Sequence, residues 1–260
     1  MFILGRTQMI SGATSAEAVK RLMAKGFDGV ELSAYDKEFQ PRMEFFDADF
    51  PGMIKDTLIE CGAKAYSVSA HMDFVAFDEK FEIVQNVINV AGKINAPIVI
   101  ITGAQDGMSP ERDALYAKQI ERTSVLCGLA KERGITLAVE FEPGFVVGTT
   151  LQVLQLIKNV GSDALKINMD IGHSFLVDPD PMAAIASCSG LIAHAHIENM
   201  EAGIHNHIIP SEGDMDIKAY FRQLRAAGYD GYASIDLYQY DYESIAESSI
   251  KFIRDAWNSM

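Results

Sequence analysis

The sequence has few of the residues that mark several large classes of protein. Its 260 residues include one tryptophan and only three cysteines, Cys61, Cys127 and Cys188, with no Cys-x-x-Cys pair. An odd number of scattered cysteines does not build a disulfide framework, so we expect buried free thiols in a reducing, cytoplasmic compartment. No apolar run approaches the ~20 residues that cross a bilayer. The short apolar run at the amino terminus does not match a secretory signal. We therefore expect no membrane association.

Basic residues are also scarce. The chain has 22 lysines and arginines against 36 aspartates and glutamates, a formal net charge of −14 at pH 7. Nucleic-acid binders usually present a basic surface to phosphates, so this balance argues against nucleic acid as a partner. It is compatible with a small substrate, because a bound cation can reverse the local field. GxSxG, GxGxxG and GxxxxGK motifs are absent, so no signal for a serine hydrolase or a nucleotide-binding turn is present.

What the sequence does contain is a regular alternation of strand and helix patterns, with hydrophobic residues making up 48% of the chain. Strands are expected at 2–5, 29–33, 65–71, 98–103, 136–142, 165–170, 191–198 and 232–237. Helices are expected at 15–26, 51–61, 79–95, 110–133, 150–159, 181–187, 216–227 and 242–257. Strands separated by helices pair in parallel through right-handed crossovers. Eight such units in about 250 residues predict an α/β fold, a single (β/α)8 TIM barrel over residues 1–260. An open doubly wound sheet is the alternative, but it usually carries a glycine-rich turn after its first strand.

Ionisable residues stand at the carboxyl ends of four predicted strands. Glu140 follows Leu-Ala-Val, Asp170 follows Ile-Asn-Met, His196 follows Ile-Ala-His-Ala and Asp236 follows Ala-Ser-Ile. A strand buried on both faces should be continuously apolar, whereas the carboxyl ends of barrel strands converge on one mouth. Three carboxylates and an imidazole gathered there would repel one another or stay unpaired without a cation. The pattern predicts a site for a divalent metal ion.

Further polar residues flank these strand ends. Glu142 and Glu198 each follow a predicted ligand by two residues, so each shares a strand face with that ligand. Glu31 and His71 stand near the ends of two other predicted strands. We expect all four to bind substrate rather than metal. The alternative for each is structural: a solvated carboxylate, a loop cap or a buried, hydrogen-bonded histidine.

The joined motifs resemble those of a known superfamily. Leu-Ala-Val-Glu140-Phe-Glu-Pro-Gly, Met-Asp170-Ile-Gly-His, His-Ala-His196-Ile-Glu-Asn and Ser-Ile-Asp236-Leu-Tyr are similar to the motifs of xylose isomerase-like barrels, the sugar phosphate isomerase and epimerase group. The resemblance covers nearly the whole chain. It implies that Glu140, Asp170, His196 and Asp236 hold one divalent ion, with Mn²⁺ expected first and Co²⁺, Mg²⁺ or Zn²⁺ as alternatives.

The same resemblance implies that His173 and a rim histidine, His207, contact substrate. Two features depart from the pattern. The last ligand is Asp236, where the superfamily usually has glutamate. Ketose 3-epimerases carry Asn-Arg after the first glutamate and an arginine after the histidine strand. Here these places read Glu-Pro-Gly and Glu-Asn-Met. The motifs therefore support the broad superfamily rather than the 3-epimerase group.

The expected reaction moves a proton next to a carbonyl of a sugar or keto-sugar, through an enediolate that the ion stabilises. Glu140 and Asp236 are the expected pair of base and acid. Return of the proton gives epimerisation or isomerisation, whereas loss of a neighbouring substituent would make the enzyme a keto-sugar lyase or dehydratase. An apurinic endonuclease-like hydrolase would need more metal ligands and a basic surface. A sugar-binding barrel without catalysis would need neither acid nor base. A homo-oligomer is compatible with the sequence.

Overall fold

The eight predicted strands form a closed parallel barrel in the computed structural model, which describes residues 1–260. They are β1 (Phe2–Arg6), β2 (Gly29–Ser33), β3 (Ala65–Ala70), β4 (Ile98–Ile101), β5 (Thr136–Glu140), β6 (Leu165–Asp170), β7 (Ile192–Ile197) and β8 (Tyr232–Ile235). Each strand pairs with the next in the sequence, and β8 closes the ring on β1, with Leu4 in register with Ser234. The prediction of a (β/α)8 barrel is confirmed.

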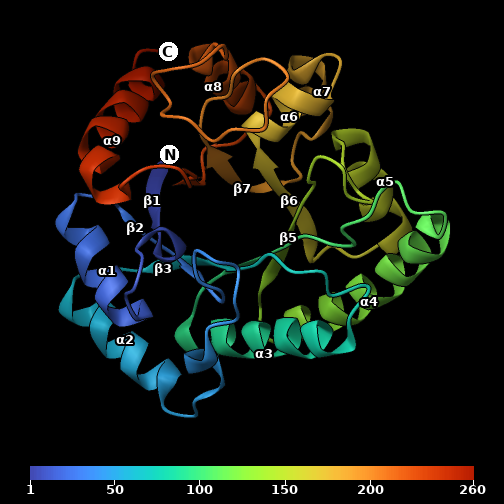
Figure 1. The fold of residues 1–260 in the computed structure, drawn as a ribbon, viewed down its shortest axis with the longest axis horizontal. Helices are drawn as coiled ribbons and strands as arrows, with labels where there is room; N and C mark the ends of the chain where they lie inside the picture. Colours follow the sequence, from blue (N-terminus) through green and yellow to red (C-terminus); the bar gives the residue numbers. More distant parts are fainter.

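The helices form an outer layer around the barrel (Figure 1). They are α1 (Ser15–Ala24), α2 (Phe50–Glu60), α3 (Asp78–Ile94), α4 (Arg112–Glu132), α5 (Thr150–Val160), α6 (Ile171–Val177), α7 (Pro181–Ser187), α8 (Ile217–Ala226) and α9 (Tyr242–Asn258), with 3₁₀ turns η1 (Thr7–Met9) and η2 (Met43–Phe46). A core cluster of 68 buried residues joins the helices to the strands. No helix combines the length and apolar character needed to cross a bilayer.

One element differs from the sequence-based prediction and affects the site. No helix was predicted between 159 and 181, but α6 begins directly after Asp170. The Asp170 side chain is its N-cap, with Oδ1 accepting a hydrogen bond from His173 N at 2.8 Å. Gly172 is needed for close approach: its N–H donates to Glu198 Oε1 at 2.7 Å, and a Cβ at this position would overlap that oxygen. The helix therefore fixes the direction of His173.

Candidate functional site

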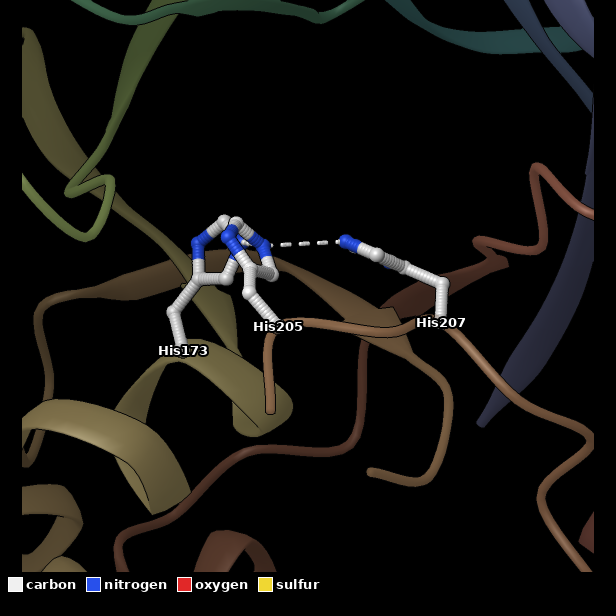
Figure 2. Close-up of side chains that lie close together, drawn as sticks. All are labelled: His173, His205 and His207. Carbon is white, nitrogen blue, oxygen red and sulfur yellow. Dashed lines mark hydrogen bonds between the residues drawn. The ribbon is translucent and has the colours of Figure 1, made fainter. Parts of the chain in front are cut away.

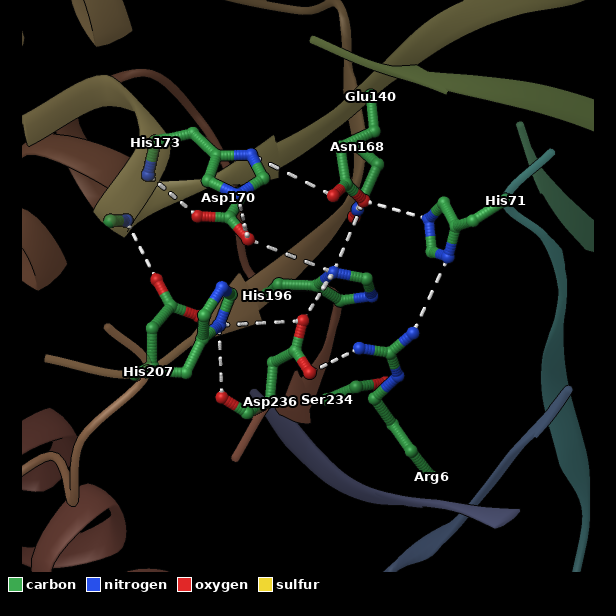
Figure 3. A network of polar contacts seen from close by, with 12 residues as sticks. Arg6, His71, Glu140, Asn168, Asp170, His173, His196, His207, Ser234 and Asp236 are labelled. Carbon is green, nitrogen blue, oxygen red and sulfur yellow. Dashed lines mark hydrogen bonds and ion pairs between the residues drawn. The ribbon is translucent and has the colours of Figure 1, made fainter. Parts of the chain in front are cut away.

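The ends of β5 to β8 bring the four predicted metal ligands together at one mouth of the barrel (Figure 3). His196 Nδ1 lies 3.1 Å from Glu140 Oε2, 3.6 Å from Asp236 Oδ2 and 3.9 Å from Asp170 Oδ2. All four residues are buried, and the most exposed, Glu140, is 4% exposed. One imidazole nitrogen is thus surrounded by oxygens of three carboxylates.

This nitrogen of His196 has no hydrogen-bond partner, and neither has Asp170 Oδ2. The other ring nitrogen, Nε2, lies 3.0 Å from Glu31 Oε2, and a carboxylate there accepts the Nε2–H. Nδ1 is therefore the nitrogen that faces the three carboxylates. Metal-bound histidines typically donate their other N–H to a carboxylate in this way. Burial would lower the pKa of His196, but Glu140 and Glu31 raise it well above its usual value, so positive charge at Nδ1 is favoured, and a bound ion would replace the proton there.

The candidate ligands fall into overlapping groups rather than one closed set. Ligand atoms lie within 4.8 Å of one another in the groups His71, Glu140, His196 and Asp170, Glu198, His207, Asp236. The predicted ligands are divided between these two groups. Ligand bonds of roughly 2.0–2.3 Å allow separations of up to about twice that length between ligands. Each contact of 3.1–3.9 Å at His196 Nδ1 lies within this span, whereas the four predicted ligands do not form one such group.

A buried arginine at the end of β1 also belongs to this site and was not among the residues predicted from the sequence. Arg6 is 0% exposed, its Nε donates to Glu31 Oε1 at 2.9 Å, and its Nη1 forms an ion pair with Asp236 Oδ1. Burial would raise the pKa of Asp236, but Arg6 above all, and then His207, lower it below its usual value. Asp236 is therefore held as a carboxylate. The first strand was predicted to end at Gly5; one residue more would have placed Arg6 among the strand-end groups.

A layer of neutral polar side chains lies beneath Glu140. Asn168 donates to Glu140 Oε2, and its Oδ1 lies 2.8 Å from His194 Nδ1. The other ring nitrogen of His194 is within 3.2 Å of Ser67 Oγ and 3.3 Å of Ser234 Oγ. Burial lowers the pKa of His194 to about 3, so the ring is neutral. His194 and Asn168 thus orient Glu140 from inside the barrel.

A cavity of about 530 Å³ opens above these groups, a size typical of small-molecule sites. Its wall contains most of the predicted site residues, namely His71, Glu140, Glu142, His173, His207 and Asp236. His205, from the same loop as His207, also lies on the wall. The wall is completed by residues that were not predicted, namely Lys37, Phe39, Thr102, Gln105, Phe145, Tyr238 and Gln239. His71 Nε2 lies 3.0 Å from Glu140 Oε2, which joins the wall to the predicted metal ligands.

Glu31 and Glu198 do not line the cavity, although we expected both to contact substrate. Both are 0% exposed. Glu31 is held by Arg6, His196 and Ser234, and Glu198 accepts the N–H of Gly172. Burial, followed by the nearby Asp170 and Asp236 carboxylates, raises the pKa of Glu198 well above its usual value. Both lie beneath the cavity wall, where they hold neighbouring groups in position instead of contacting a substrate.

Three histidines meet on the cavity wall, each with a nitrogen facing the others (Figure 2). His173 Nδ1 donates to Phe141 O at 2.9 Å, and His207 Nδ1 donates to Asp236 O at 3.2 Å. Burial would lower the pKa of His173, but Asp170 and Glu142 raise it to about 9, so the ring is protonated at neutral pH and its Nε2 is a donor. Burial lowers the pKa of His207, so that ring is neutral and its Nε2 is an acceptor. The two Nε2 atoms lie 3.1 and 3.2 Å from His205 Nε2, which accepts the hydrogen bond from His173. His207 Nε2 is therefore available to accept a hydrogen bond from a hydroxyl in the cavity.

Comparisons with known proteins agree with this architecture. The family model described as "Xylose isomerase-like TIM barrel" matches residues 19–256. Fructoselysine 3-epimerase from Shigella flexneri is 25% identical over 163 residues, 61% of this chain and 59% of that protein, so the chain spans less than two thirds of this relative's length. Inosose dehydratase from Clostridium perfringens is 22% identical over 254 residues, 87% of this chain and 83% of that protein.

A solved structure shows the same fold over almost its full length. The apo 3-keto-D-glucoside 4-epimerase from E. coli superposes with a TM-score of 0.81 at 17% identity, covering 98% of this chain and 99% of that one. The match of the family model to most of the chain decides the assignment. This chain belongs to the xylose isomerase-like TIM barrel family.

Proposed function

We propose that the protein is a divalent-metal-dependent isomerase or epimerase that acts on a sugar or keto-sugar. The observation that carries this proposal is the unpaired Nδ1 of His196, which faces oxygens of Glu140, Asp170 and Asp236 below a cavity of about 530 Å³. These four side chains would hold the ion. Mixed carboxylate and imidazole ligation suits a hard or borderline divalent ion better than a metal that selects thiolates. We expect Mn²⁺ first, with Co²⁺, Mg²⁺ and Zn²⁺ as alternatives. The epimerases among the similar proteins support the same class of reaction.

Glu140 is the proposed base. It lies on the cavity wall, where it can reach a hydrogen on the carbon next to a substrate carbonyl. Burial would raise the pKa of Glu140, but His71 and His196 lower it well below its usual value, so it is ionised and able to accept a proton. A bound divalent ion would supply a Lewis acid that makes this hydrogen more acidic. Asp236, also on the wall and held ionised by Arg6, is the proposed partner that exchanges the proton with the substrate.

A keto-sugar dehydratase or lyase is the second candidate, and Glu142 is the observation that favours it. Glu142 lies on the cavity wall, with Oε1 3.7 Å from His173 Nε2. Burial raises the pKa of Glu142 to about 7, so a fraction of this side chain is protonated at neutral pH. A neutral carboxylic acid at the wall can protonate a leaving oxygen after the first proton is removed. The similarity to inosose dehydratase is consistent with this alternative.

The experiment that tests the proposal combines metal analysis with proton exchange. The purified protein should bind about one divalent ion per chain, and Mn²⁺-loaded protein should exchange a carbon-bound hydrogen of a free ketose or keto-glycoside with deuterated water. A chelator should abolish the exchange, and added Mn²⁺ should restore it, because the ligand set holds the only Lewis acid of the site. NMR of the recovered sugar distinguishes epimerisation and isomerisation from elimination.

Other metal contents would contradict the proposal. Three ions per chain with phosphodiester cleavage would support an apurinic endonuclease-like hydrolase. No bound ion together with sugar binding would support a barrel that binds sugars without catalysis.

We expect His173→Ala to retain its metal and to lose substrate affinity. His173 Nδ1 donates to Phe141 O. Despite burial, Asp170 and Glu142 raise the pKa of His173 to about 9, so Nε2–H can donate to a substrate oxygen. Because a hydrogen bond contributes about 1 kcal/mol, kcat/KM should fall roughly five- to tenfold, with metal content per chain unchanged. Steady-state kinetics and metal analysis of the same preparation check this. Loss of metal in His173→Ala would instead make His173 a ligand.

A further inference from the structure

Arg6 has every guanidinium nitrogen occupied by protein groups. Its partners are Glu31 Oε1 at 2.9 Å, Gln8 Oε1 at 3.0 Å, the hydroxyls of Tyr35 and Tyr238 at 3.3 Å each, His71 Nδ1 at 3.4 Å and the Asp236 carboxylate. The side chain is 0% exposed and does not line the cavity. It therefore does not touch a substrate. Any effect on the reaction has to pass through the groups that it binds.

One of these groups is Asp236, which is also one of the four proposed metal ligands. Arg6 Nη1 pairs with Asp236 Oδ1, whereas Asp236 Oδ2 lies 3.6 Å from His196 Nδ1 (Figure 3). The contact with Arg6 is an ion pair without hydrogen-bond alignment, since Oδ1 has no hydrogen-bond partner. The two oxygens of Asp236 are thus separated in role: one faces the guanidinium and the other faces the proposed ion position.

The second group is Glu31, which controls His196. Arg6 binds Glu31 Oε1, and Glu31 Oε2 accepts from His196 Nε2 at 3.0 Å and from Ser234 Oγ at 2.7 Å. This contact fixes the orientation of the His196 ring, with Nδ1 3.1 Å from Glu140 Oε2. One buried guanidinium therefore orients two of the four proposed ligands, Asp236 directly and His196 through Glu31. A planar fork of donors is suited to binding two carboxylates at fixed angles.

We propose that Arg6 is a positioning residue that matches the metal centre to an aspartate at position 236, and this inference rests on the proposed function. An aspartate is shorter than a glutamate by one carbon–carbon bond, about 1.5 Å. With Arg6 present, a glutamate at 236 would move its carboxylate onto the guanidinium or past His196 Nδ1. Without Arg6, the aspartate loses its anchor, and the longer side chain can reach the ion on its own. The effect of Asp236→Glu therefore depends on Arg6.

The test measures Mn²⁺ affinity, by titration calorimetry, for Asp236→Glu in two backgrounds. In the native chain this substitution should weaken Mn²⁺ binding roughly tenfold, as expected when the support of a metal ligand is disturbed. In Arg6→Met it should strengthen binding. Each comparison is between two proteins with the same residue at position 6. The direct repulsion between Arg6 and the ion is therefore the same in both and does not affect the difference in Mn²⁺ affinity. Arg122→Met is the matched control: Arg122 is largely buried but pairs with Asp78 and the Phe74 carbonyl, so Asp236→Glu should weaken binding there as in the native chain.

An effect of Asp236→Glu in the same direction in both backgrounds would overturn the role of Arg6 and leave the metal centre standing. If Arg6→Met does not fold, Arg6→Lys takes its place, because lysine keeps the charge without the planar fork. In Arg6→Lys, Asp236→Glu should again strengthen Mn²⁺ binding instead of weakening it. Weaker binding in this background would also overturn the role of Arg6. A native protein that binds no Mn²⁺ or other divalent ion would overturn the metal centre itself, and this proposal with it.

Discussion

Glu140→Gln is expected to slow the exchange of substrate hydrogen with solvent by about 10²–10⁴-fold, the contribution typical of a positioned base. Glutamine keeps the size of the side chain and one oxygen that can bind a metal ion, but it cannot accept a proton. In the native site, His71 and His196 hold the pKa of Glu140 well below its usual value, so the group that is lost is an ionised base. Deuterium incorporation, followed by NMR at saturating Mn²⁺, measures the effect.

Glu44→Gln provides the matched control for this variant. Glu44 accepts hydrogen bonds from Ser15 and does not line the cavity, so the same chemical change there should leave exchange at the native rate. Metal content has to be measured on the same samples, because Glu140 is also a proposed ligand. A metal-loaded Glu140→Gln protein with native exchange would restrict Glu140 to holding the ion.

The barrel and the cluster at its mouth were both predictable from short-range patterns. Helices and strands alternate along the chain with clear periods, and parallel strands in a barrel end at one mouth. A carboxylate or imidazole at the end of an apolar strand can therefore be predicted to lie at the barrel mouth, even when none of its contacts is known. Glu140, Asp170, His196 and Asp236 gather for this reason.

The depth of individual side chains in the barrel was less predictable than their face. Glu31 lies two residues before the end of β2, and Asn168 lies two residues before the end of β6. Alternation therefore points both side chains into the barrel, but below the level of the strand ends. Glu31, expected at the substrate, is buried beneath the cavity, and Asn168 supports Glu140 from inside the barrel.

Contacts between the two ends of the chain left no local signal at all. Arg6 pairs with Asp236 across the closure of β1 on β8, and the two residues are distant in the sequence. No sequence motif around a single basic residue at a strand end identifies the residue with which it pairs. His205 was difficult for a related reason, since it lies outside the regular elements and reaches His173 only through the path of the chain after β7.

Asp236→Asn is expected to retain some metal while losing proton exchange by about 10²–10⁴-fold, if Asp236 is the second proton-transfer group. Asparagine keeps the length of the side chain and one oxygen for a metal ion, but it removes the carboxylate that Arg6 holds ionised. Exchange and metal content are measured as for Glu140→Gln. Glu142→Gln is the informative comparison, because Glu142 also lies on the cavity wall and its pKa is raised to about 7.

The two variants separate two arrangements of the site. The ion pair with Arg6 stabilises the charged form of Asp236, whereas Glu142 has a pKa close to the value that suits proton transfer at neutral pH. A large loss in Asp236→Asn with little change in Glu142→Gln would place the second proton transfer at Asp236. Native exchange in metal-loaded Asp236→Asn, with the loss in Glu142→Gln instead, would leave Asp236 as a ligand anchored by Arg6. Proton transfer would then run between Glu140 and Glu142, two residues apart on one side of the cavity, as elimination from one face of a keto-sugar requires.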